Sequence, residues 1–132
     1  MTKSQRKYLD QLTANIEAAK AVGLTATVEV EDHDFFISVR VRIEFDTSNV
    51  KTRRIGHDQQ FRAALMIGKR GGVDGSCQAG SIFSDNEYRK GVYGGDRKAD
   101  LFSFSVRNGC EYEINDLIRT AERMAELDNE AA

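Results

Sequence analysis

Lysine and arginine stand beside glycine at three places in the middle of the chain, and this combination suits the binding of an anion. Glycine leaves backbone N–H groups open to form a concave anion site, and a neighbouring cation adds charge-assisted hydrogen bonds. Two tyrosines near the second place have rings that can stack on a nucleic-acid base. Solvated hairpin tips use the same residue types, so that alternative stays open. The candidate anion-binding residues are Lys69, Arg70, Tyr88, Arg89, Lys90, Tyr93, Arg97 and Lys98.

The stretch GKRG at residues 68–71 has the GxxG pattern with which KH domains clamp a nucleic-acid backbone. A KH loop leads into a second helix, whereas the following GVDGSCQAG is poor in helix formers. GxxG also occurs at residues 72–75 and 91–94, as chance allows in a chain with 11 glycines, and neither GxxxxGK[ST] nor GxGxxG is present. We therefore interpret GKRG as the end of a helix and the start of a glycine-rich basic segment, residues 68–99.

A second basic feature lies on a predicted strand. Arg40 and Arg42 are two residues apart in FISVRVRIE, so they project from the same face of that strand. Arginine is enriched at protein interfaces, and Arg53 and Arg54 follow closely enough to extend the patch. We expect these four arginines to form a face for a protein partner or for nucleic acid, or else a solvated face paired with Glu44.

His33 between two aspartates, and the two cysteines, are the remaining candidates for chemistry. A DHD triplet holds adjacent side chains that diverge, and aspartate is common in turns for backbone reasons. A structural zinc site needs about four ligands at close spacing, which His33, His57, Cys77 and Cys110 do not provide. We therefore predict no catalytic residue, no metal site, no cofactor and two free thiols.

Composition is that of an ordinary globular domain: 132 residues, 40% hydrophobic and 30% charged. The absence of an apolar run of roughly 18 residues, and of a secretory signal, predicts a cytoplasmic protein that does not enter a membrane. The net charge is −2, but the charges are distributed unevenly along the chain. Residues 34–107 carry thirteen Lys/Arg against nine Asp/Glu, whereas residues 108–132 carry two against seven. The excess of basic residues in this middle segment indicates an anionic partner. Head-to-tail association of copies, or solubility, would also account for it.

Hydrophobic spacing predicts one helix at each end of the chain. The first covers residues 4–22, with Ser4 as N-cap and Gly23 as the stop, and the last covers residues 115–127, capped by Asn115.

Alternating apolar residues predict hairpins at 25–46 and 101–114, and a short helix is expected at 57–67. Two weak strands are expected at 78–84 and 87–93. The sequence thus predicts a single α+β domain over residues 1–132, with an antiparallel sheet of about four to six strands covered on one face by the N- and C-terminal helices. The predicted cross-strand pairs are Val30 with Phe35 and Val28 with Ile37 in the first hairpin, and Val106 with Cys110 and Phe104 with Tyr112 in the second.

These features predict a small non-enzymatic binding protein whose basic middle binds a nucleotide or single-stranded nucleic acid. The alternative is a protein–protein inhibitor or adaptor, homodimeric or not, that uses the arginine face or the acidic C-terminal helix. Phages and other mobile elements encode many small domains that block host defence systems, and this one is of that size. An enzyme of unassigned chemistry is the third hypothesis.

Overall fold

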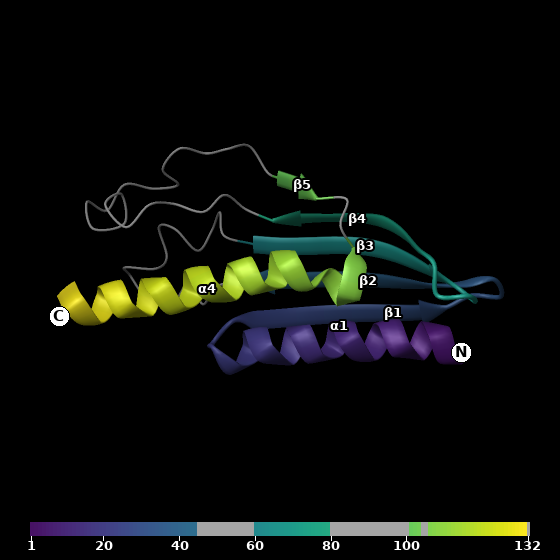
Figure 1. The fold of residues 1–132 in the computed structure, drawn as a ribbon, viewed down its shortest axis with the longest axis horizontal. Coiled ribbons are helices and arrows are strands. Elements are labelled where there is room, and N and C mark those ends of the chain that lie inside the picture. Colours follow the sequence, from purple (N-terminus) through teal and green to yellow (C-terminus); the bar gives the residue numbers. More distant parts are fainter. Residues whose placement is uncertain (45–59, 80–100, 104–105, 132) are drawn as a thin grey trace.

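The computed structural model describes residues 1–44, 60–79, 101–103 and 106–131. Its sheet has five antiparallel strands in the order β1-β2-β3-β4-β5, and two helices lie against it (Figure 1). The predicted α+β fold is therefore confirmed. The elements are α1 (Lys3–Ala21), β1 (Thr25–Asp32), β2 (Phe36–Glu44), β3 (Gln60–Gly68), β4 (Val73–Ala79), β5 (Leu101–Ser103) and α4 (Arg107–Ala131).

One hydrophobic core lies between the helix pair and one face of the sheet. Alternate residues of β2 and β3 are buried there, and the two helices contribute apolar residues at helical spacing. Within the described residues, neither helix is long and apolar enough to cross a membrane. The core comprises Tyr8, Leu12, Ile16, Ala19, Leu24, Ile37, Val39, Val41, Ile43, Phe61, Ala63, Leu65, Ile67, Cys77, Cys110, Ile114 and Leu117.

Helix α1 begins one residue earlier than the sequence indicated, and its N-cap lies two residues earlier. Thr2, and not Ser4, is the N-cap, because the Thr2 hydroxyl accepts from the Gln5 backbone N–H while the Gln5 side chain accepts from the Thr2 N–H. Gly23 follows the helix with φ +94°, so the predicted glycine stop is confirmed.

The β1–β2 hairpin forms as predicted, but its register differs by four residues. Val30 pairs with Val39 rather than with Phe35, and Val28 pairs with Val41. The turn is correspondingly later, and the His33 N–H donates to the Phe36 carbonyl over 2.9 Å. A shift of four leaves every side chain on its predicted face, so apolar alternation alone does not discriminate between the two registers.

Residues 60–68 form a strand, β3, so the helix predicted at 57–67 is wrong where the structure describes it. Phe61 and Leu65 fit both a helical and an alternating pattern. Pairing with β2 on one side and β4 on the other gives the backbone of this segment its hydrogen bonds. GKRG is consequently the β3–β4 hairpin turn, closed by Gly71 N–H to Gly68 O at 2.8 Å. It neither ends a helix nor joins two helices as a KH loop does.

The second predicted hairpin, 101–114, is also wrong. Among the described residues of this segment, Leu101–Ser103 form strand β5 and those from Arg107 onward belong to α4, which thus begins before the predicted helix start at 115. Cys110, Ile114 and Leu117 repeat at helical spacing and are buried. The alternating residues Cys110, Tyr112 and Ile114 would fit a strand equally well. Packing against α1 decides that this segment is a helix and not a strand.

Gly109 has a left-handed backbone, with φ +68°, and Asn108 and Cys110 share it. A Cβ at Gly109 would lie 2.4 Å from the Leu12 nitrogen in α1. The Asn15 side-chain amide donates to the carbonyls of Asn108 and Gly109 at 2.8 and 2.9 Å. The turn into α4 is therefore held against α1 at close range.

Replacing Gly109 by Ala should lower the free energy of unfolding by about 3 kcal/mol, because backbone strain adds to a steric clash with α1. Gly72→Ala is the matched control, since a Cβ there meets nothing within 4 Å, and it should change stability by less than about 0.5 kcal/mol. Urea unfolding of both variants checks the prediction. Equal stability of the two variants would contradict it.

Candidate functional site

The candidate site is the face of the sheet that points away from the helices, here called the open face. On β2 and β3, one set of alternate residues is buried under the helices, and the other set points to this side. Among the described elements, both helices lie on the buried side. The open face is therefore a surface of the sheet that no described helix covers.

Three arginines lie at neighbouring positions on the open face. Arg40 and Arg42 lie on β2, as the sequence predicted, and Arg62 lies directly opposite Arg42 on β3. All three are exposed. The sequence analysis missed Arg62 because it assigned residues 57–67 to a helix. Alternation of Phe61, Ala63, Leu65 and Ile67 was the signal that would have placed it beside Arg42.

Carboxylates surround this arginine cluster. The Arg42 Nε lies 2.9 Å from Glu44 Oε1 in an ion pair, and Glu29 on β1 is directly opposite Arg40. Glu31 and Asp74 complete the acidic side chains at described open-face positions. Three arginines thus stand among four carboxylates, which gives the open face a mixed charge rather than a strongly positive one.

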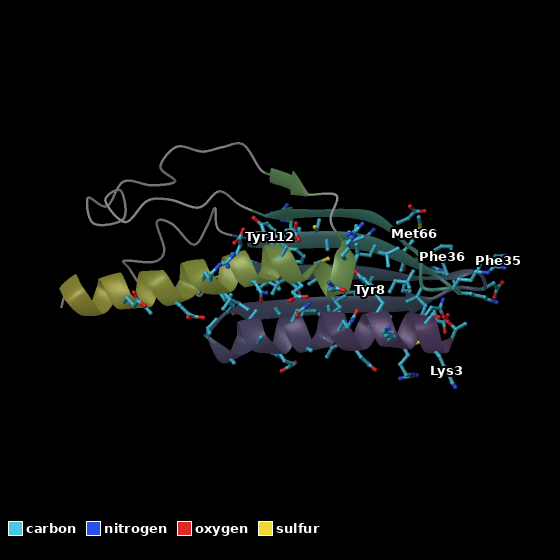
Figure 2. All side chains as sticks on the ribbon, viewed as in Figure 1. Lys3, Tyr8, Phe35, Phe36, Met66 and Tyr112 are labelled. Atoms are coloured by element: carbon cyan, nitrogen blue, oxygen red, sulfur yellow. The ribbon has the colours of Figure 1, made fainter. Side chains whose placement is uncertain are left out.

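Apolar side chains are present at one end of the open face. Met66 is exposed and lies opposite Ser38, near Phe36 at the start of β2. Figure 2 shows Met66, Phe36 and the exposed Phe35 at the same end of the sheet. His33 stacks on Phe36 with ring centroids 4.6 Å apart.

The same histidine has no metal-site geometry. Its Nε2 lies 3.1 Å from Ser38 Oγ and 3.5 Å from Glu31 Oε2. Within the described part of the chain, no group of three potential ligands could hold a metal ion. These contacts link His33 to neighbouring residues of the hairpin.

Lys69 and Arg70 lie in the β3–β4 turn, away from the arginine cluster. Lys69 is seven residues beyond Arg62 along the chain, roughly 23 Å in an extended strand. The turn is joined instead to the start of α1, where the Thr2 hydroxyl donates to the Lys69 carbonyl over 2.7 Å. The Gln5 side-chain amide adds a bond to the Ile67 carbonyl at 3.1 Å.

The exposed cations on the two segments that this junction joins are here called the basic end. It combines the two cations of the turn with cations from the first two turns of α1, and all of their side chains are exposed. The first turn of α1 carries no acidic residue. The residues of the basic end are Lys3, Arg6, Lys7, Lys69 and Arg70.

The other predicted site residues lie outside the described part of the chain, so the structure does not test whether they converge with either surface. The two weak strands predicted at 78–84 and 87–93 also lie there, apart from Gln78 and Ala79 at the end of β4. The residues concerned are Arg53, Arg54, Tyr88, Arg89, Lys90, Tyr93, Arg97 and Lys98.

Four polar or ionisable side chains form a buried cluster beneath the helices: Tyr8, Cys77, Cys110 and Glu113. The Tyr8 hydroxyl donates to the Val106 carbonyl at 2.7 Å and lies 3.7 Å from Cys110 Sγ. Both cysteines are free thiols. Since all four side chains are buried, we assign the cluster to the core and not to a site open to a substrate.

The surroundings of this cluster shift the pKa values of Tyr8 and Cys110 in opposite directions. Loss of water, followed by repulsion from Cys110, raises the pKa of the Tyr8 hydroxyl far above its usual value. A hydrogen bond from the Cys77 thiol, opposed by burial and assisted by Tyr8, lowers the pKa of Cys110. Glu113 Oε2 has no hydrogen-bond partner, which is an unfavourable arrangement for a buried carboxyl group.

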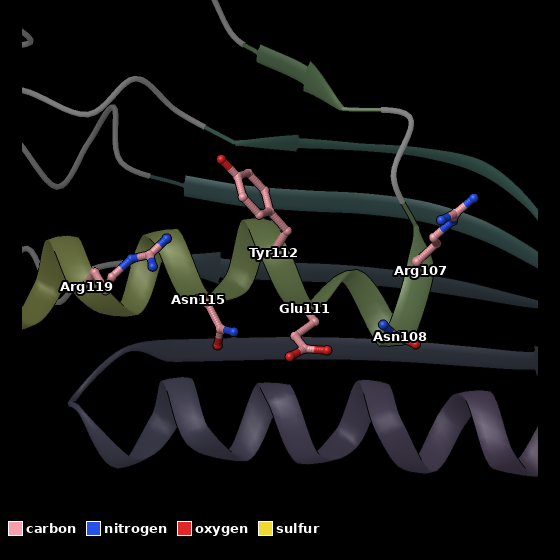
Figure 3. Close-up of a pocket in the computed structure, with 6 residues that line it drawn as sticks. All are labelled: Arg107, Asn108, Glu111, Tyr112, Asn115 and Arg119. Atoms are coloured by element: carbon pink, nitrogen blue, oxygen red, sulfur yellow. The ribbon is translucent and has the colours of Figure 1, made fainter.

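A shallow hollow of about 340 Å³ lies along the start of α4 (Figure 3). Arg107 and Tyr112 point to the side away from α1, whereas Asn115 and Glu111 point towards it. Arg119, also in its lining, forms an ion pair with Asp116. Because the polar groups diverge instead of converging on one point, the hollow does not have the geometry of a small-ligand site.

Comparison with models of protein families, with curated proteins and with solved structures finds no match to this chain.

The buried phenol of Tyr8 should make stability sensitive to alkaline pH. Its pKa is higher in the folded state than in the unfolded state, so the unfolded chain ionises first as pH rises. The contribution of the neutral phenol is complete below about pH 10 and is lost above it, at about 1.4 kcal/mol per pH unit.

Above about pH 10, Tyr8→Phe should therefore lose stability with pH less steeply than the wild type. Near neutral pH the variant should be less stable by about 1 kcal/mol, because the bond to the Val106 carbonyl is lost. Urea unfolding across this pH range measures both effects, with the exposed Tyr112 changed to Phe as control. Parallel pH profiles for Tyr8→Phe and the wild type would refute the assignment.

Proposed function

We propose that the protein is a non-enzymatic binding module that docks the open face of its sheet on a protein partner bearing acidic side chains. The observation that carries this proposal is the cluster of Arg40, Arg42 and Arg62 on a sheet face that no described helix covers. Arginine combines a planar charged group with an apolar stem, and it is enriched at protein interfaces for this reason.

The arrangement of these arginines supports a binding role over a purely structural one. Arg42 and Arg62 occupy directly opposed positions, and like charges at such positions destabilise a sheet. Arg42 also forms an ion pair with Glu44. A carboxylate of a partner that reaches the exposed guanidinium groups of this cluster would form charge-assisted hydrogen bonds with them.

The mixed charge of the open face favours a protein over nucleic acid as its partner. A nucleic-acid surface needs an excess of cations along the phosphate backbone, together with aromatic rings on which bases stack. Instead, Glu29, Glu31 and Glu44 lie beside the arginine cluster. The aromatic Phe36, which is half-buried, lies at one end of the open face. Exposed Met66 offers an adaptable apolar contact of the kind found in protein interfaces.

Charge reversal of the cluster tests this proposal. The double variant Arg40→Glu/Arg42→Glu should fold normally, because both side chains are exposed, and should lose its partner. Affinity capture from cells of the source organism, followed by mass spectrometry, identifies proteins retained by the wild type. Binding of a purified partner is then measured directly and should weaken at least tenfold in the variant.

Lys3→Glu/Lys7→Glu on α1 is the matched control, since it makes the same change of charge away from the open face. It should retain the partner. Loss of the partner by this control, or its retention by Arg40→Glu/Arg42→Glu, would count against docking on the open face.

The basic end supports a second candidate function, the binding of single-stranded nucleic acid. The hydrogen bond between Thr2 and the Lys69 carbonyl brings the turn that carries Lys69 and Arg70 to the start of α1, where three further cations are exposed. Such a surface neutralises phosphates and releases counterions, so affinity should fall steeply as salt rises.

A labelled single-stranded oligonucleotide provides the test of this second candidate. Wild-type affinity should decrease between about 50 and about 200 mM salt, with a logarithmic slope near −0.7 for each neutralised phosphate. Lys69→Glu/Arg70→Glu should weaken binding and flatten that slope by about 1.4 if each cation contacts one phosphate. Arg40→Glu/Arg42→Glu should leave it unchanged. Absence of binding at low salt would exclude the basic end as a nucleic-acid site.

A further inference from the structure

We propose that the outer edge of β1, residues 25–32, is the surface at which two copies of this chain associate, by antiparallel pairing of β1 with β1. This inference is independent of the proposed binding function of the open face. It rests on the backbone direction, the exposed apolar side chains and the charge pattern of a single strand.

Strand β1 lies at the end of the sheet order and pairs with β2 alone among the described strands. Its ladder with β2 runs without interruption for all eight residues. Natural edge strands are usually protected against further pairing by charged side chains, above all lysine, or by proline, a bulge or short length. Lysine, proline, a bulge and short length are absent from Thr25–Asp32, whose charged residues are the acidic Glu29, Glu31 and Asp32.

The backbone groups of β1 alternate between β2 and the outside. The His33 N–H donates to the Phe36 carbonyl, and these two residues continue the β1–β2 register. Odd-numbered residues of β1 therefore direct their N–H and C=O groups to β2. Even-numbered residues, among them Ala26, Val28 and Val30, direct theirs outward, where they can pair with another strand.

The same even-numbered residues carry apolar side chains that the chain leaves uncovered. Val28 and Val30 are 45% and 48% exposed, whereas Val41 and Val39 opposite them on β2 are 3% and 1% exposed. All four lie on the helix side of the sheet. The apolar layer of the core thus continues to the edge of β1 without being covered there.

One register of the pairing suits residues 25–31 and places Asp32, the last residue of the strand, opposite Leu24. With Val28 on the two-fold axis, Val28 faces Val28 of the second copy and Ala26 faces Val30, so apolar side chains meet on the helix side. On the open face, Thr27 faces Glu29 and Thr25 faces Glu31, and no like charges are directly opposed. The outward backbone groups of Ala26, Val28 and Val30 all enter hydrogen-bonded pairs.

Neighbouring registers are less favourable. An axis at Glu29 places two Glu29 carboxylates directly opposite each other, and an axis at Val30 places Glu29 against Glu31 and Val28 against Asp32. An axis at Thr27 pairs Val30 with Leu24, which lies before the strand and is already buried in the core. The charge and hydrophobic pattern of β1 therefore selects Val28 as the symmetric position.

This geometry gives an isologous dimer with one continuous sheet. The two-fold axis is perpendicular to the sheet, so the helices of both copies lie on the same side and both arginine clusters lie on the other. Exposed Val28 and Val30 become part of a shared apolar layer.

Sedimentation analysis of the full chain over a concentration series tests the association. The wild type should reach twice the chain mass of 14.8 kDa. Val28→Lys should sediment as a monomer with an unchanged circular dichroism spectrum, because it places two ammonium groups on the axis. Tyr112→Lys, which adds the same charge at an exposed residue of α4, should remain dimeric. A wild type that stays monomeric throughout the series would overturn the proposal.

Cross-linking tests the register separately. In a hydrogen-bonded antiparallel pair the two Cα atoms are about 5.5 Å apart, which a disulfide spans. Val28→Cys should therefore form a covalent dimer under mild oxidation, while the wild type, whose own cysteines are buried, should not. Glu31→Cys should not cross-link either, because two copies of position 31 are six residues out of register, roughly 20 Å apart. Cross-linking of Glu31→Cys at the rate of Val28→Cys would overturn this register.

Discussion

Gly109 packs directly against the backbone of α1 at Leu12, where any side chain larger than hydrogen would clash. Asn15 donates to the Asn108 and Gly109 carbonyls beside it, and Tyr8 donates to the Val106 carbonyl just before α4. Three successive left-handed residues lead into the helix at this point. Because one long helix is held so closely against the other, α1 and α4 form a single layer over one face of the sheet.

The position of that layer determines which parts of the sheet remain accessible. Ile37, Val39 and Leu65 are buried beneath it, while the intervening residues of the same strands face the opposite side. The arginine cluster follows directly from this arrangement, since β2 and β3 each present their charged alternate residues there. Binding surfaces on such a sheet are rigid, because the strands that carry them are fixed by the core behind them.

Charge is distributed over the described surface in two different ways. The open face mixes arginine with glutamate, as in the Arg42–Glu44 pair, which suits a partner with its own pattern of charges. At the basic end, the turn that carries Lys69 and Arg70 is bonded to Thr2, next to a first turn of α1 that has no acidic residue, which suits a uniform polyanion. In the edge strand β1, Glu29 and Glu31 alternate with Val28 and Val30, so these two carboxylates lie on the open face and the valines on the helix side.

The local sequence pattern was sufficient to predict several features of the structure. The N-terminal helix follows from helical spacing of its apolar residues. The alternation of β2 and the shared face of Arg40 and Arg42 follow from a two-residue repeat. Such features depend on near neighbours in the chain. The α+β class also follows, because helical spacing at both ends and strand spacing between them leave few ways to bury the apolar faces.

Where the apolar residues of a segment fit both a helical and a strand pattern, only the tertiary structure decided which of the two forms. Phe61 and Leu65 are compatible with a helix or a strand, and pairing on both sides makes β3 a strand and places Arg62 opposite Arg42. Cys110 and Ile114 fit both states too, and packing on α1 makes the segment helical. The β1–β2 register and the contact of Lys69 with Thr2 likewise depend on residues distant in the sequence. The sequence by itself determined which residues alternate and which repeat with a helical period, whereas long-range packing and pairing decided which of these patterns the chain uses.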